Sequence, residues 1–249
     1  MMITPYEIKF VLKPNPNAPV ALGILMAMQK VIQDASTDHA TVIGYGKTDM
    51  DANHVFWAIA RLRVTFLKPL KAEETYAIKT WPNPSDAVGI DRNYLVFDAF
   101  GELVVKGMGK WVIVDKTSFK LVKPKNCPLT NNQTNLLIEK VYSDGYRRYP
   151  IDDSKPTFSL ERTVQDHEID HNGHVNNVVY LDYLFSTVNE WNGSPLEVSE
   201  YQLNYSDSLF KDDQFVIHLV NHKDDLSLSA YRIKAEGNSL VFQAQIQKK

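Results

Sequence analysis

The residue types best suited to chemistry gather in one stretch of the sequence, residues 167–177. Three histidines, two carboxylates and three asparagines surround a single glycine there. Histidine exchanges protons near neutral pH, and a neighbouring carboxylate can orient it or hold a water molecule. This stretch is therefore the first candidate for an active site.

One interpretation of the stretch is a zinc site. Residues 167–171 match the pattern H-E-x-x-H, in which a helix places two histidines on one face and the glutamate acts as a base. However, Asn172 and Gly173 follow at once, a pair that ends helices, and the preceding residues lack helical periodicity. The sequence therefore disfavours this reading, and we expect no metal.

A second interpretation uses Asp170, Asn172 and His174. In an extended loop, residues i, i+2 and i+4 project to the same side, so these side chains would converge. The loop would lead into a helix whose N-terminus offers backbone N–H groups to a carbonyl oxygen gaining negative charge. The competing interpretation is a loop that only caps the helix, with His174 packed against it. Residue types alone leave the two open.

The elements that must position these residues occur in two halves with the same predicted order. In each half an extended segment precedes a helix with apolar residues on one face, and four strand-like runs follow. The first half has the extended segment 6–12, the helix 19–43, and strands at 54–66, 74–81, 91–98 and 102–115. The second half has the extended segment 157–164, the helix 176–191, and strands at 198–205, 214–221, 226–235 and 239–247.

Two local echoes favour an internal duplication. Residues 70–73 correspond to 210–213, a turn before a strand, and 97–101 correspond to 233–237, a hairpin with glycine at its turn. A helix wrapped by a curved antiparallel sheet, twice over, is an α+β plan. We therefore predict an N-terminal domain at 1–125, a linker rich in Pro and Asn at 126–155, and a C-terminal domain at 156–249.

Composition narrows the class of protein. The net charge of −3 and the absence of a basic run argue against a nucleic-acid partner. The apolar stretch 19–28 is shorter than the roughly 20 residues that span a bilayer and lacks secretory architecture. The single cysteine, Cys127, fits a reducing compartment, and we interpret it as a surface or linker thiol. We expect a cytoplasmic protein without membrane insertion.

The candidate stretch resembles the signature of the acyl-acyl-carrier-protein thioesterases. Residues 168–177, E-I-D-H-N-G-H-V-N-N, followed by Tyr180, are similar to that family's pattern acidic-x-D-x-N-x-H-V-N-N…Y. Further similar segments cover most of both halves but not the linker: 29–35 with His39, the T-W-P at 80–82, 91–101 and 111–115.

The resemblance implies a double hotdog fold, in which each half wraps a sheet around its long helix and the two sheets join. It implies hydrolysis of fatty acyl thioesters on acyl carrier protein, which releases free fatty acid and ends fatty acid synthesis. No metal or organic cofactor is implied. Asp170, Asn172 and His174 fall on the catalytic Asp, Asn and His of the family.

We also expect the two halves to have different roles. The first half has K-P-N-P-N at 13–17 before its helix, without Asp or His, so we expect one active site per chain. The first half would hold the acyl chain. Backbone N–H groups of Val175 and Asn176 would stabilise the oxyanion at the start of the second helix.

One position departs from the family pattern. Plant members carry a Glu-Cys pair in the strand after the second helix, where this chain has Asn204 and Tyr205. Asn204 is a candidate substrate-binding residue, and the water-activating role would pass to Asp170 or His174.

Two other functions remain open. One is a hydrolase of the same fold that acts on acyl-coenzyme A, and the other is a non-catalytic acyl-binding module, which the departure at Asn204 would suit. Because the two halves can satisfy each other's sheet edges, we expect either a monomer, as a pseudo-dimer, or a homodimer.

Overall fold

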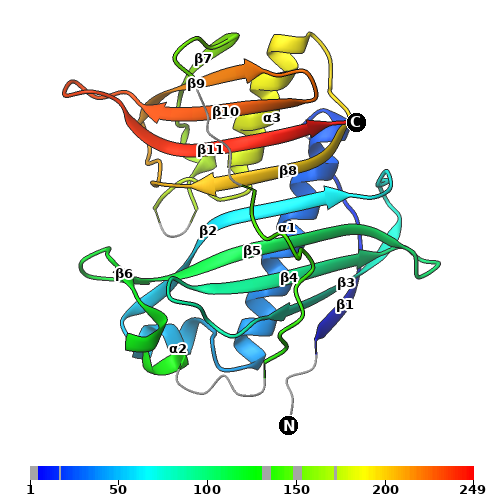
Figure 1. The fold of residues 1–249 in the computed structure, drawn as a ribbon, viewed down its shortest axis with the longest axis vertical. Helices are drawn as coiled ribbons and strands as arrows, with labels where there is room; N and C mark the ends of the chain where they lie inside the picture. Colours follow the sequence, from blue (N-terminus) through cyan, green and yellow to red (C-terminus); the bar gives the residue numbers. More distant parts are fainter. Residues whose placement is uncertain (1–4, 17, 131–135, 148–152, 171–172) are drawn as a thin grey trace. The chain divides into compact units, whose positions relative to one another are not determined.

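The computed structural model describes residues 5–16, 18–130, 136–147, 153–170 and 173–249. These residues form two compact units (Figure 1). Unit 1 comprises Met1–Lys13 and Met28–Gly145, and unit 2 comprises Pro14–Ala27 and Tyr146–Lys249. Each unit contains one antiparallel sheet and helical residues packed against it.

Unit 1 is built on a sheet in which the chain order is not the spatial order. The strands lie in the order β1-β3-β4-β5-β2, and the short β6 pairs with β5. The helix α1 (Val20–Val42) belongs to unit 1 from Met28 onward, and its earlier residues belong to unit 2. The other elements of unit 1 are β1 (Tyr6–Val11), α2 (Lys47–Ala52), β2 (Val55–Phe66), β3 (Thr75–Pro82), β4 (Ile90–Phe97), β5 (Leu103–Asp115) and β6 (Leu121–Val122).

Unit 2 repeats this order with its own strands, β7-β9-β10-β11-β8. Its elements are β7 (Phe158–Thr163), α3 (Val179–Asn192), β8 (Val198–Tyr205), β9 (Gln214–Asn221), β10 (Asp225–Arg232) and β11 (Ser239–Lys248). In both units the first strand pairs with the third, and the second strand lies at the opposite edge, beside the fifth. The predicted α+β class, with two hotdog units, is confirmed.

The backbone repeats in finer detail as well. In unit 1, Leu12 donates its N–H to the carbonyl of Glu74 (3.0 Å) and accepts the N–H of Glu73 (2.8 Å). In unit 2, Val164 makes the equivalent pair of bonds with the turn before β9, where Asp212 is the donor (3.2 Å). Glu73 and Asp212 both have a positive φ, 61° and 65°. This supports an internal duplication but matches Glu73 to position 212, one residue from the alignment that the sequence suggested.

The core of unit 2 lies between α3 and the inner face of the sheet. Tyr180 packs edge-on against Tyr205 and Phe242, with ring centroids 5.2 and 5.4 Å apart. The helix ends at Gly193, whose φ of 71° is left-handed, a conformation that glycine adopts at little cost. Apolar periodicity predicted the helix from residue 176, but it begins at Val179, because Asn176 Oδ1 accepts the N–H of Val178 and forms a turn first.

The interior of unit 1 contains a buried histidine. His39, on α1, is 2% exposed, and its Nδ1 lies 3.1 Å from a guanidinium nitrogen of Arg92 on β4. Because guanidinium only donates, Nδ1 accepts and the imidazole proton lies on Nε2. Burial, and secondly the positive charge of Arg92, lower the pKa of His39 from 6.5 to about 4. His39 is therefore neutral at neutral pH.

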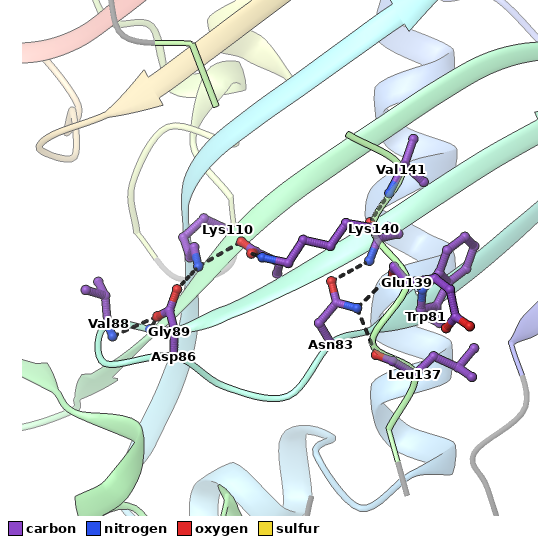
Figure 2. Close-up of polar contacts among 12 residues, drawn as sticks. Trp81, Asn83, Asp86, Val88, Gly89, Lys110, Leu137, Glu139, Lys140 and Val141 are labelled. Carbon is purple, nitrogen blue, oxygen red and sulfur yellow. Dashed lines mark hydrogen bonds and ion pairs between the residues drawn. The ribbon is translucent and has the colours of Figure 1, made fainter. Parts of the chain in front are cut away.

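A segment that the sequence suggested to be linker covers the outer face of the unit 1 sheet. We call residues 136–145 the strap (Figure 2). Asn83 donates to two strap carbonyls at 2.8 and 2.9 Å, and Trp81 Nε1 donates to that of Glu139 at 3.0 Å. Asn93 accepts the N–H of Val141 at 2.9 Å and donates to Asn83 at 2.8 Å. The strap backbone is thus satisfied by buried side chains of the sheet, in place of a neighbouring strand.

Ion pairs also attach the strap to the unit 1 sheet. Lys140 in the strap contacts Asp91 on β4 at 2.7 Å, and Asp91 also pairs with Lys110 on β5 at 2.8 Å (Figure 2). The compact units therefore differ from the predicted domains in two respects. Residues 126–145 belong to unit 1, although 126–155 were expected to be a linker, and residues 14–27 belong to unit 2.

Cys127 is a core residue, so its interpretation as a surface or linker thiol was wrong. It is 2% exposed and packs with Met50, Val55 and Ile113. Short 3-10 turns at Pro124–Asn126 and Pro128–Thr130 fold this segment onto the unit. The thiol there acts as a small apolar group. Among the described residues, no helix has the length and apolar character needed to cross a membrane.

We expect unit 1 to lose stability between pH 6.5 and pH 4 because of His39. The unfolded chain takes up a proton on this imidazole near pH 6.5, whereas the folded protein does so only near pH 4. In this window the unfolded state binds more protons, so the free energy of unfolding falls as the pH is lowered. The loss should approach about 3 kcal/mol by pH 4.

Urea unfolding across this pH window measures the effect. Tryptophan fluorescence reports mainly on unit 1, which contains Trp57, Trp81 and Trp111, whereas unit 2 contains Trp191. His39→Gln should flatten the pH profile, whereas the same change at the exposed His222 should leave it as in the wild type. Parallel profiles for wild type and His39→Gln would contradict the prediction.

Candidate active site

The loop between β7 and α3, residues 164–178, carries the candidate catalytic residues; we call it the site loop. Its centre is a small hairpin, with an isolated antiparallel bridge between Ile169 and Val175. Asp170 donates its N–H to the carbonyl of His174 at 2.9 Å, and Gly173 donates to the carbonyl of Asp170 at 3.0 Å. Gly173 has a φ of 85°, so this tight turn depends on glycine.

The hairpin places Asp170 and His174 opposite each other. Their side chains approach to 3.7 Å, between Oδ1 and Nδ1, and are 16% and 27% exposed. This is an electrostatic contact rather than a hydrogen bond. The sequence predicted that an extended loop would bring the two together, and the pair is indeed adjacent, but a hairpin turn produces it. Asn172, the third predicted catalytic residue, lies outside the described residues.

The helix that a zinc H-E-x-x-H site needs is not formed here. A single 3-10 turn covers Asp166–Glu168, and Ile169 is already extended, with φ −83° and ψ 132°. The Glu168 carboxylate is turned into the unit. Among the described residues, no three His, Cys, Asp or Glu side chains are placed to share a metal ion.

Glu168 anchors the site loop to the core of unit 2. One of its carboxylate oxygens accepts the hydroxyl of Tyr183 at 2.7 Å and the N–H of Gln165 at 2.6 Å. Its backbone carbonyl accepts the N–H of Asn176 at 3.0 Å. Burial and the bond to Glu168 raise the pKa of Tyr183. Tyr183 therefore stays a protonated donor, and Glu168 fixes both ends of the hairpin.

A second segment, which lies between β8 and β9 and contains Leu209 and Phe210, supports the site loop. Leu209 accepts the N–H of Val175 at 2.9 Å and donates its own N–H to the Tyr180 hydroxyl at 3.1 Å. The next residue, Phe210, meets the His174 ring edge-on at 6.2 Å between centroids. The orientation of His174 thus depends on a segment that lies 36 positions further along the chain.

Arg232 on β10 holds that supporting segment in place. Its guanidinium pairs with Asp207 at 3.0 Å and Asp213 at 2.9 Å, and it donates to the carbonyl of Ser208. The same guanidinium lies 5.8 Å from the centroid of the Phe210 ring. One arginine therefore ties both ends of the segment that touches His174.

The expected oxyanion donors need a correction. The N–H of Val175 already donates to Leu209 and the N–H of Asn176 to Glu168. Both groups thus serve to hold the hairpin, and neither is available to a substrate oxygen in this structure. The physical reason is that an irregular loop packed on the core must satisfy its backbone donors internally.

Asn204 lies on β8, and its Oδ1 accepts from Gln202 Nε2 at 3.4 Å. The following residue, Tyr205, donates its hydroxyl to the carbonyl of Asn177 at the start of the helix (3.3 Å). Because successive strand residues face opposite sides, the Asn204 side chain lies on the face away from α3. A substrate-binding role for Asn204 stays a prediction.

Sequence reasoning missed the residues that position the pair, chiefly Glu168, Phe210 and Arg232. Glu168 was noted only as the acidic member of a motif. A signal for it existed, since an acidic residue close before a predicted helix and three residues after Gln165 suggests a capping role. Phe210 and Arg232 gave no such signal, because their contacts with the site join distant parts of the chain.

The arrangement suits general acid–base chemistry. His174 is exposed enough to meet a substrate, and its Nδ1 faces the carboxylate of Asp170. Such a pair can take a proton from water and return it to a leaving group.

Comparison with known proteins identifies the family of the chain. Two family models match the chain: the acyl-ACP thioesterase N-terminal domain at residues 21–125 and the acyl-ACP thioesterase C-terminal domain at residues 152–248. The chloroplastic oleoyl-acyl carrier protein thioesterase 1 of Arabidopsis thaliana is 20% identical over 225 residues. These residues are 84% of this chain and 61% of that relative, so the chain spans about three-fifths of its length.

Two solved structures show the same fold. An acyl-ACP thioesterase from Bacteroides thetaiotaomicron has a TM-score of 0.79 at 15% identity, with 98% of both chains covered. The 12:0-ACP thioesterase from Umbellularia californica has a TM-score of 0.81 at 18% identity, with 98% of this chain and 97% of that one covered. Together with the two family models, they place the fold among double hotdog proteins. The chain belongs to the acyl-ACP thioesterase family.

Proposed function

We propose that this protein hydrolyses fatty acyl thioesters carried on acyl carrier protein, giving free fatty acid and the free carrier thiol. The observation that carries the proposal is the Asp170–His174 pair at 3.7 Å, held in a hairpin within the matched C-terminal domain. The relatives named above are an oleoyl-acyl carrier protein thioesterase and a 12:0-ACP thioesterase. We further propose that the reaction takes place in the cytoplasm and needs no cofactor.

In the proposed mechanism His174 is the general base and acid. Its Nδ1 faces Asp170, which leaves Nε2 to take a proton from water as the water oxygen bonds to the thioester carbonyl carbon. The tetrahedral intermediate then collapses, the C–S bond breaks, and Nε2 returns the proton to the departing sulfur. Asp170 stabilises the imidazolium between these steps, and Asn172 positions the water or the carbonyl.

Two alternatives have the same fold but different outcomes. A hydrolase of acyl-coenzyme A would need the same proton transfers, so only the carrier distinguishes it. A non-catalytic acyl-binding module would bind acyl thioesters without releasing thiol. Because the Asp170–His174 pair can accept and donate a proton, it favours a catalytic function over acyl binding alone.

The first experiment is thiol release from a panel of acyl thioesters on acyl carrier protein and on coenzyme A. We expect release from the carrier-protein thioesters with higher kcat/KM, and no change when EDTA is added. A preference for coenzyme A would replace the proposed substrate. Stable acyl binding without thiol release would identify a binding module.

We expect His174→Ala to lower kcat by about 10²- to 10⁴-fold, the usual contribution of a general acid–base group. The matched control is His218→Ala, because His218 lies in the same unit and contacts Ser159 at 2.8 Å, away from the site loop. The control should keep kcat within a few-fold of the wild type. If His174→Ala retained similar activity, His174 would have no place in the mechanism.

We expect Glu168→Ala to lower kcat about 10- to 100-fold at nearly constant KM, because the hairpin that aligns Asp170 and His174 loses its anchor. The buried hydroxyl of Tyr183 and the part-buried N–H of Gln165 would lose their acceptor, at a cost of about 2–3 kcal/mol of stability. Glu168→Gln keeps an acceptor oxygen there and should restore most of kcat.

Steady-state kinetics of the Glu168 variants, with urea unfolding, provide the measurement. Val188→Ala, in the buried face of α3, is the control for lost stability alone. It should unfold more easily yet keep its kcat. An equal fall of kcat in Val188→Ala and Glu168→Ala would show that Glu168 contributes stability only.

A further inference from the structure

Arg92 is a buried cation in unit 1 that has no carboxylate partner among the described residues. It lies on β4 and is 5% exposed. One guanidinium nitrogen makes its polar contacts, to Nδ1 of His39 at 3.1 Å and the hydroxyl of Thr80 at 3.4 Å. Both acceptors are neutral. Within the part of the chain that the structure describes, the Arg92 side chain has no other hydrogen bond or ion pair.

The acidic residues close in sequence do not compensate this charge. Asp91 is the next residue in the strand, so it faces the opposite side of the sheet, where it pairs with Lys110 and Lys140. Burial also lowers the pKa of Arg92, as expected when charge is placed in an apolar interior without a counter-charge. Buried charges in proteins are normally paired, because an unpaired one is costly.

The surroundings of Arg92 are otherwise apolar. In register, Thr80 pairs with Tyr94, and Ile78 pairs with Val96, on the same face of the sheet as Arg92. Ile78, Tyr94 and Val96 are all fully buried. The Tyr94 hydroxyl is satisfied by Ser36 at 2.9 Å, which leaves the guanidinium as the charged group of this interior.

We propose that Arg92 binds the carboxylate of a ligand with an alkyl chain, inside unit 1. A guanidinium presents its N–H donors in a planar fork that matches a carboxylate, and this pairing supplies the missing negative charge. In the proposed complex the alkyl chain lies against the apolar side chains on the same face of the sheet, Ile78, Tyr94 and Val96. A purely hydrocarbon ligand would leave the buried charge as costly as before.

Two sources could supply such a carboxylate. One is a free fatty acid, bound after release or from solution. The other is an acyl thioester whose far end carries a second carboxylate, and this source rests on the proposed hydrolase function. The competing role for Arg92 is purely structural, in which it ties α1 to the sheet through His39 and Thr80.

Arg92→Met distinguishes ligand binding from a structural role, because it removes the charge but keeps a long side chain. If Arg92 serves a ligand, the ligand-free variant should have an unchanged Tm or one raised by about 2–4 °C, since replacing an unpaired buried charge by an apolar group is neutral or stabilising. If Arg92 is structural, Tm should fall.

Binding of octanoate by calorimetry, with octanol as the uncharged control, tests the ligand class. Wild type should bind octanoate, Arg92→Met should bind it at least about 10-fold more weakly, and octanol should not distinguish the two proteins. Arg92→Lys keeps the charge and should retain part of the octanoate affinity. It serves as the second variant if Arg92→Met does not fold.

Kinetics separate the two sources. Wild type and Arg92→Met are compared on the octanoyl thioester and on the monothioester of octanedioic acid. A preference of the wild type for the second substrate, lost in the variant, identifies the far-end carboxylate. Octanoate binding without this preference identifies the free fatty acid. A lower Tm in Arg92→Met with unchanged octanoate affinity and unchanged substrate preference overturns the proposal.

Failure of the proposed hydrolase function would look different. Inactive wild-type protein that still binds octanoate through Arg92 would remove the hydrolase proposal and keep this one. His174→Ala should bind octanoate like the wild type, because its change lies in unit 2.

Discussion

The site depends on how an irregular loop satisfies its own backbone. Residues 164–178 have no continuous strand or helix to take up their N–H groups, yet they must hold two side chains at a fixed separation. The fold solves this with the Ile169–Val175 bridge, the carbonyl of Glu168 and the carbonyl of Leu209. The bonds that make the pair possible also consume the donors that a helix start would offer a substrate. The backbone N–H groups that hold the loop rigid are therefore the same groups that could otherwise bind a substrate anion.

The two units share a strand order but differ inside. In unit 2 the contacts between α3 and the sheet are largely aromatic, and the polar groups lie at the helix start. In unit 1 a neutral His39 and a charged Arg92 lie between helix and sheet. A duplicated plan therefore carries two different interiors. This fits a division in which one copy supplies proton transfer and the other supplies recognition.

Sequence patterns were sufficient for the regular parts of this fold and for the candidate pair. Period-2 runs predicted the bounds of the long strands to within three residues, and the spacing of Asp170 and His174 predicted their proximity. The pattern did not reveal that Cys127 is buried or that the strap covers a sheet. Both depend on packing between distant segments, and Pro-rich or polar sequence resembles a linker until its partners are known. The anchoring of Glu168 by Tyr183 was hidden for the same reason.

The division of α1 between the two units affects how the chain folds while the ribosome synthesises it. Unit 1 is complete once Gly145 has been made, but Pro14–Ala27 belongs to a unit whose remaining residues, Tyr146–Lys249, are synthesised later. Leu22, 4% exposed in the finished protein, must wait for them. Until those residues have been made, the first turns of this helix leave apolar surface uncovered, and such surface promotes aggregation. Premature termination within unit 2 should thus leave a chain with a folded unit 1 and an exposed apolar segment, of the kind that chaperones bind.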